Sequence, residues 1–291
     1  MDDIVGNATR CVLAFSGLHG PLLSPMACWS DGTALWMSTP AASHKVAALR
    51  QRPDCTVYVA PTGPEERGSV VHGRARVYGP GDPLGLALHA PAVSAAMAAL
   101  ALRNAPSLLG YVQDAARVPW RFAWQNRVAL KVAVQQLHGV DPPALGPGVA
   151  PALPTEVPPD VRRALAGARR AVLAVRRDDG VHDDGADDDG QLVVGPVVLG
   201  AGYALAGLAA LGITPRPTAQ GARTGPRDEP AALVLTAAGA DRRPTSAVGL
   251  MLRGRLRGDR LEPTRITWWQ GFDTTTVAVS PRPAGSVVLP D

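Results

Sequence analysis

The chain has 291 residues, a formal net charge of +4 and 46% hydrophobic residues, so it is long enough for two domains that each bury a core. Its 29 basic residues are scattered among only four tyrosines and three phenylalanines, which argues against nucleic-acid binding. The three cysteines fit neither a disulfide set nor a Cys-x-x-Cys metal motif, and the polar start MDDIVGNATR is no signal peptide, so we expect a cytoplasmic protein without a metal.

The first half reads as a run of antiparallel strands. Arg10–Gly17 is an apolar run that ends in a turn, and hairpin-like segments follow it. Thr56–Ala60 and Ser69–Val77 alternate with the period of a curved antiparallel sheet. The long apolar segment Asp82–Arg103 predicts a helix interrupted at Pro91. This order favours a barrel with a helix across it over an alternating βαβ sheet.

Within these strands, the stretch WMSTPAASHK holds Lys45, one of only two lysines in the chain. Pro40 enforces a bend after the strand, and Ser43 stands at the expected N-cap of a helix that stops at Pro53. The unpaired N–H groups of the first turn, the helix dipole and Lys45 would form a small anion site, with His44 as a second donor. An ordinary capped surface helix with a solvated lysine is the alternative.

A proline-rich segment divides the chain. Residues 141–160 hold seven prolines and no helical or strand period, which indicates a semi-rigid linker. We therefore expect one domain over residues 1–140 and a second over residues 161–291. Three matches in the same order predict that the second domain duplicates the first. RCVLAFSG resembles RAVLAVRR, VVHGRARVYGP resembles MLRGRLRGDRLEP, and strands around Trp-Gln in RFAWQNRVALKV and RITWWQGFDTTTV are expected to close each half.

Two segments of the second half need separate interpretation. Leu192–Ile213 runs 22 residues without a charge, long enough to span a bilayer. Its five glycines favour a buried strand followed by a packed helix, and we expect no membrane contact. The acidic run Asp178–Gly190 lacks the closing glutamate of a calcium loop and is expected to be a solvated hairpin extension.

The stretch around Lys45 resembles the phosphate segment of the pyridoxamine 5'-phosphate oxidase-like family, the FMN-binding split β-barrels. In that family a strand ends in Thr, and after three variable residues Ser-Arg-Lys opens a helix and holds the flavin phosphate. Thr39, Ser43, His44 and Lys45 fall on those positions, with histidine in place of arginine. The opening hairpins also look like those that lay backbone against the flavin ring, and RITWWQG is similar to the family's Ile-x-Phe-Trp-Gln-Gly strand.

The resemblance implies a set of cofactor-binding residues. They are Ser24, Pro25, Met26, Ser38, Thr39, Ser43, His44, Lys45, Trp124 and Trp269. The two tryptophans are placed at matching positions of the two halves, where an aromatic pair that only fills the barrel mouth is the alternative.

The resemblance also implies a mainly β fold with two split β-barrel repeats that form an intramolecular pseudo-dimer. Family members pair two barrels as a homodimer with two equivalent sites. Here the second half has the neutral LGAGYALAGL where the phosphate segment should recur. We therefore expect one flavin site, built on the first barrel and closed by Trp269, in a monomer or weak homodimer.

The implied function is that of an FMN-binding oxidoreductase that acts on a small molecule by hydride transfer. Arg74, Arg76 and Arg121 are candidates to receive anionic groups. True pyridoxamine phosphate oxidase activity is not expected, because FDTTTVAV replaces the family's Arg-x-His after the Trp-Gln-Gly strand. The alternatives are a deazaflavin-dependent reductase and a non-catalytic flavin- or haem-binding protein, so whether the chain is an enzyme stays open.

Overall fold

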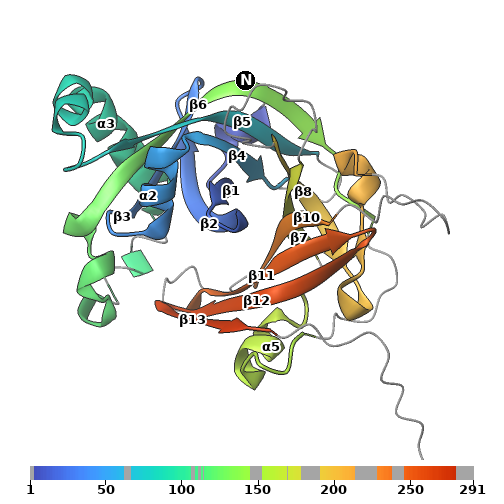
Figure 1. Cartoon of the computed structure of the whole chain (residues 1–291). Helices are drawn as coiled ribbons and strands as arrows, with labels where there is room; N and C mark the ends of the chain where they lie inside the picture. The colour runs from blue at the N-terminus through green and yellow to red at the C-terminus, as the bar shows by residue number, and fades with distance from the viewer. Residues whose placement is uncertain are drawn as a thin grey trace, which may run out of the picture.

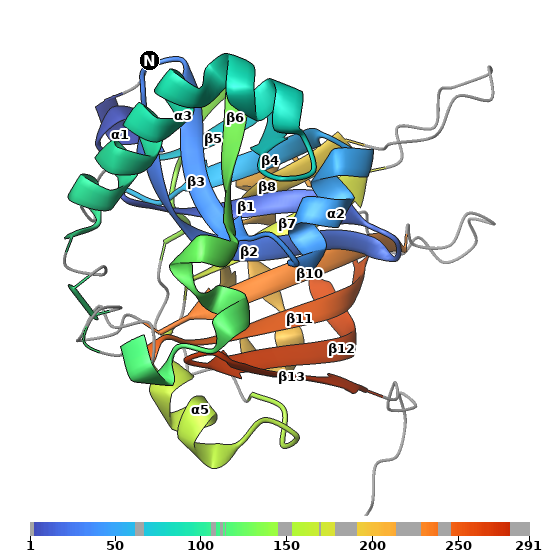
Figure 2. The same cartoon turned by 90° about the vertical axis from the view of Figure 1, so that its left-hand side faces the viewer.

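Strands dominate both halves of the chain and form two β units that pack against each other (Figures 1 and 2). The structure is a computed structural model. It describes residues 3–61, 67–105, 109–110, 113, 115–144, 153–168, 170–177, 191–213, 228–237 and 246–279. The predicted mainly β fold with two split-barrel halves is confirmed, although only the first half closes into a barrel.

Six strands of the first half close into a barrel in the order β1-β2-β3-β6-β5-β4. They are β1 (Arg10–Gly17), β2 (Gly20–Ser30), β3 (Ala34–Pro40), β4 (Asp54–Val59), β5 (Gly68–Tyr78) and β6 (Arg127–Val140). Inward side chains such as Leu13, Leu35, Val57, Val71 and Leu130 are completely buried. Their alternation with outward side chains gives the first half a core of its own.

Helices cover this barrel from outside. They are α1 (Asp3–Asn7), α2 (His44–Gln51) and α3 (Pro83–Arg103), followed by the 3-10 turns η1 (Ala115–Arg117), η2 (Trp120–Phe122) and η3 (Trp124–Asn126). Val46 and Leu49 of α2 enter the barrel core. The predicted interruption of α3 is wrong: the helix continues through the exposed Pro91, because Val93, Ala96 and Leu100 hold its other face to the barrel. Among the described residues, α3 alone is long and apolar enough to cross a membrane by those two criteria.

The second half is an open sheet in the order β13-β12-β11-β10-β7-β8-β9. Its strands are β7 (Arg170–Arg177), β8 (Gln191–Leu199), β9 (Leu205–Ala206), β10 (Glu229–Thr236), β11 (Val248–Arg257), β12 (Arg260–Gln270) and β13 (Asp273–Ala278). From β7 to β12 the order repeats that of β1 to β6, but β9, the counterpart of β3, has only two residues. The edge of β12 that β9 would occupy in a closed barrel is taken by β13. In the part of the chain that the structure describes, one bridge between Ala204 and Arg260 and a backbone hydrogen bond of 2.7 Å from Leu205 N–H to the Asp259 carbonyl connect this segment to the start of β12, so the barrel stays open.

The predicted packed helix after β8 is wrong. The segment instead holds η4 (Ala201–Tyr203), β9 and η5 (Leu208–Leu211). Gly202, Gly207 and Gly212 have φ angles of 62°, 96° and 67°, a left-handed backbone that breaks a helix at each of them. The acidic run Asp178–Gly190 lies outside the described residues.

A β-bulge recurs at the same place in the Gly-Arg-x-Arg strand of both halves. The pairing register shifts just before Gly73 in β5 and between Arg253 and Gly254 in β11. A Cβ at Gly73 would collide with the backbone carbonyl of Ala133, and a Cβ at Gly254 with that of Glu262. Close approach of the partner strand therefore requires glycine at both bulges.

The two Trp-Gln pairs do not occupy matching positions. Trp124 lies in η3, ahead of β6, whereas Trp269 lies within β12. The bulge glycines Gly73 and Gly254 align the two halves. Five residues before each of them, Gly68 pairs with Val140 and Gly249 pairs with Trp269, so Trp269 corresponds to Val140. The predicted match of Trp124 with Trp269 is therefore wrong, because a short matching motif does not fix strand register.

One apolar cluster joins the two halves. Ala14, Leu23, Tyr58 and Val70 of the barrel pack in the same buried cluster as Leu233 of β10. The Thr56 hydroxyl also donates to the Leu192 carbonyl across the boundary at 3.5 Å. Behind the open sheet, α5 (Pro159–Leu165) places Val161 and Leu165 in the same cluster. The halves thus share a core in addition to the one inside the barrel.

Candidate functional site

The bend after β3 brings polar side chains to the start of α2. Thr39 is buried at the end of the strand, and Ser43 is the N-cap residue, as predicted. The Ser43 hydroxyl makes no capping bond to the helix and lies 3.2 Å from the Thr39 hydroxyl instead. The first turn of α2 therefore keeps N–H groups that no capping side chain satisfies.

Lys45 is not a solvated surface lysine. Its side chain is half-buried, and its Nζ donates a hydrogen bond of 2.6 Å to Oγ of Ser24 on β2. Burial, and to a smaller extent the positive charge of Arg127, lower the pKa of Lys45 to about 8. This ammonium is held in place by a neutral hydroxyl and lies close to another cation.

Arg127 is a residue of this site that the sequence alone did not reveal. It opens β6 opposite Pro40, and its Nε and Nη2 donate to the Ser38 hydroxyl at 2.9 Å and the Ser38 carbonyl at 2.8 Å. The Ala41 N–H donates to the carbonyl of the preceding Asn126 at 2.7 Å, which ties the bend to β6. Only the pairing of β3 with β6, strands about 90 residues apart in the chain, brings Arg127 here.

These residues form a cationic, hydroxyl-lined group that we call the Lys45 cluster. Its members are Ser24, Ser38, Thr39, Ser43, Lys45 and Arg127. Within the described part of the chain, neither cation is paired with a carboxylate. Two cations, several hydroxyls and a helix N-terminus form a donor set that suits a phosphate group.

The remaining predicted residues are more dispersed. Pro25 is exposed, Met26 points into the barrel core, and His44 is exposed beside the cluster. Trp269 is half-buried on β12, where its indole lies over Gly249. The structure therefore brings the serines, threonine and lysine of the prediction together, and within the described residues it shows no hydrogen bond between them and Trp269.

Two of the three predicted anion-receiving arginines, Arg74 and Arg76, lie away from the cluster. Arg74 is exposed on β5, and Arg76 pairs with Asp82 at 3.4 Å and lies over the ring of Tyr78. Alternate side chains of β5 point out of the barrel, which exposes both arginines, and the Asp82 carboxylate after the strand holds Arg76. The side chains of Arg121 and Trp124 lie outside what the structure describes.

A pocket of about 350 Å³ lies between the two halves and borders the cluster at His44. It is lined by Gly17, Leu18, His19, Gly20, Leu22, His44, Arg253 and Arg265. The first six come from the β1–β2 turn, β2 and α2, and the two arginines come from β11 and β12. The lining residues therefore come from both halves. Figure 2 shows α2 and β2 of the first half above β10 and β11 of the second.

No protein-family model and no curated protein matches this chain. Among solved structures, it is similar to a pyridoxamine 5'-phosphate oxidase-related, FMN-binding protein from Nostoc punctiforme, with 14% identity and a TM-score of 0.33 over 46% of this chain and 75% of that one. It is also similar to a FAD-binding protein from Mesorhizobium loti, with 17% identity and a TM-score of 0.34 over 47% of this chain and 88% of that one. An F420 reductase has 18% identity and a TM-score of 0.31 over 47% of this chain and 94% of that one.

Each of these matches spans about half of this chain, the length of one split barrel. The Nostoc protein carries the name of the family that the stretch around Lys45 resembles. At these identities the similarity concerns the fold and assigns no role to a residue of this chain.

Proposed function

We propose that this chain binds one flavin-type cofactor per molecule, with the cofactor's phosphate at the Lys45 cluster. The observation that supports this is the pair of cations Lys45 and Arg127, which among the described residues donate hydrogen bonds to neutral oxygens of Ser24 and Ser38. A phosphate dianion would neutralise both cations and accept from the free N–H groups of α2. FMN, which ends in such a phosphate, is the simplest cofactor to fit.

With a flavin bound, the chain would act as an oxidoreductase on a small molecule, since the flavin itself supplies hydride transfer. The role of the protein is then to bind the phosphate, hold the ring at the boundary of the halves and exclude water. The second candidate is a deazaflavin coenzyme, whose acidic tail would find two further cations, Arg253 and Arg265, in the neighbouring pocket.

The test is a titration of the purified protein with FMN, FAD and the deazaflavin coenzyme, followed by flavin fluorescence. We expect FMN to saturate at one per chain and Lys45→Met to weaken it at least tenfold, because a charge-assisted phosphate contact contributes roughly 1.5 to 3 kcal/mol. Lys131→Met is the matched control, since this other lysine lies over the ring of Trp36.

Three results would contradict the proposal. They are two flavins bound per chain, equal affinity of the wild type and Lys45→Met, and no binding of any of the three cofactors by the wild type. The last of these results would favour a non-catalytic role for the protein.

A further inference from the structure

Arg253 and Arg265 are two like charges placed face to face. They are direct partners across β11 and β12, so their side chains leave the same face of the sheet. Met251, two residues from Arg253 on that face, packs against the cores of both halves. The face that carries the two arginines is therefore turned towards the first barrel.

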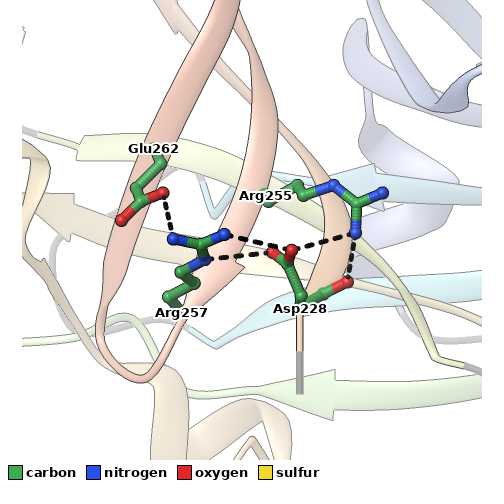
Figure 3. Close-up of polar contacts among 4 residues, drawn as sticks. All are labelled: Asp228, Arg255, Arg257 and Glu262. Atoms are coloured by element: carbon green, nitrogen blue, oxygen red, sulfur yellow. Dashed lines mark hydrogen bonds and ion pairs between the residues drawn. The ribbon is translucent and has the colours of Figure 1, made fainter. Parts of the chain in front are cut away.

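The next two arginines of β11, by contrast, are paired with carboxylates (Figure 3). Arg255 lies 3.1 Å from a carboxylate oxygen of Asp228, and Arg257 lies 3.3 Å from the same oxygen and 3.0 Å from Glu262. In the described residues, Arg253 and Arg265 have no such carboxylate, and the buried Nε of Arg253 has no hydrogen-bond partner. A buried donor without a partner is costly and calls for an acceptor.

The pocket between the halves supplies the space for that acceptor. Besides the two arginines it presents His19 and His44, and none of its lining residues is acidic. Its volume of about 350 Å³ lies at the small end of the range for ligand sites. Burial and the charge of Arg265 lower the pKa of Arg253, which indicates a positive potential that nothing in the described residues offsets.

We propose that this pocket binds the carboxylate or phosphate group of a small organic anion, gripped by Arg253 and Arg265 of the second half against the β1–β2 turn and α2 of the first. Guanidinium groups pair with both kinds of oxyanion in bidentate geometry. The pocket adjoins the Lys45 cluster through His44. Provided that the proposed function holds, the bound anion is the substrate of the cofactor, whereas the anion site itself does not depend on it.

The experiment uses the full-length Lys45→Met variant, in which the Lys45 cluster is disabled. Citrate and pyrophosphate are titrated into it by calorimetry at constant ionic strength, with chloride as the reference anion. We expect one saturable site per chain for at least one of the two probes. Adding Arg265→Gln should weaken binding at least tenfold, and Arg265→Lys should restore part of it.

The matched control is Arg255→Gln, which removes the same charge from the same strand but not from the pocket. It should leave the affinity within about twofold of Lys45→Met alone, because distant exposed charges are screened by salt. Arg265 is exposed, so its replacement is compatible with folding, which a thermal melt verifies. Absence of saturable binding, or equal losses in the Arg265 and Arg255 variants, would overturn the anion site.

The two proposals fail in different ways. If the wild type binds no flavin but the citrate or pyrophosphate site persists and requires Arg265, the cofactor proposal falls and the anion pocket stands. If flavin-saturated wild type still binds the probe, the pocket lies beside the cofactor, as a substrate site must. If FMN and the probe compete, the substrate assignment is wrong.

Discussion

A half-buried lysine ammonium beside an arginine raises the free energy of the folded state until an anion neutralises it. Lys45 has a pKa of about 8 in the folded chain, against 10.5 for an exposed lysine. Between these two pH values the unfolded chain binds more protons, so stability rises as the pH rises from about 8 to 10.5. Below pH 8 the full penalty applies, roughly 3 kcal/mol from the difference between the two pKa values.

It follows that Lys45→Met should stabilise the cofactor-free protein at pH 7, by about 1 to 3 kcal/mol, while it weakens phosphate binding. The gain should shrink as the pH is raised towards 10. Urea unfolding at pH 7 and pH 9.5 measures both effects, with Lys131→Met as the control. Equal stability changes at the two pH values would show that the Lys45 charge is not the cause.

Some residues of the two sites could be predicted from the sequence, and others could not. Ser43, Lys45 and Thr39 could be predicted as a group because they lie within seven positions of one another in a recognisable motif. Arg127 could not, because its neighbour Ser38 lies about 90 residues away in the chain and is reached only through the pairing of β3 with β6. The pair Arg253 and Arg265 could not either, because the register of the β11–β12 hairpin and its bulge decide which side chains lie opposite each other. No local pattern distinguishes them from the other arginines.

At the scale of elements, the repeated bulge is the feature with the sharpest consequence. Gly254 lets β12 approach closely and fixes where Arg253 leaves β11. We expect Gly254→Ala to destabilise the protein by about 1 to 3 kcal/mol, because its Cβ has to displace backbone rather than a flexible side chain. The same shift should weaken citrate or pyrophosphate binding in the Lys45→Met background.

Gly167→Ala is the control for this prediction, because a Cβ there meets no atom within 4 Å. Thermal unfolding of both variants measures the difference. If the two melt alike, the bulge tolerates a side chain and the close approach of β12 is not required for stability.

Period-2 patterns predicted most strands of both halves, since each strand has one face on a core. The pattern failed for Leu192–Ile213, where left-handed glycines and a two-residue strand replace the expected helix. It also failed around Trp124, because an apolar run that opens with 3-10 turns has the same composition as a strand. Backbone conformation and register, rather than hydrophobicity, decide such segments.

At the scale of the whole molecule, we expect the shared apolar cluster to make the two halves unfold as one cooperative unit. Leu23 of the first barrel is 5% exposed and packs with the second sheet. We expect Leu23→Ala to lower the free energy of unfolding by about 2 to 5 kcal/mol. Both halves should be destabilised together and still unfold in a single transition. Denaturant unfolding followed by tryptophan fluorescence and by circular dichroism measures this.

Leu88→Ala is the control, since Leu88 of α3 is 71% exposed and should change stability by less than about 0.5 kcal/mol. Separate transitions for the two probes would mean that the halves unfold independently and that the shared cluster contributes little to cooperativity.

The open second half gives the molecule strand edges that the closed first barrel lacks. A closed barrel has no edge to which another chain could add a strand, so in the described structure β9 and β13 carry the outer edges. The longer edge strand, β13, is mostly exposed and carries an aspartate and three threonines. Threonine supports a strand while keeping its surface polar, and such an edge resists the β-sheet aggregation that an apolar edge would promote.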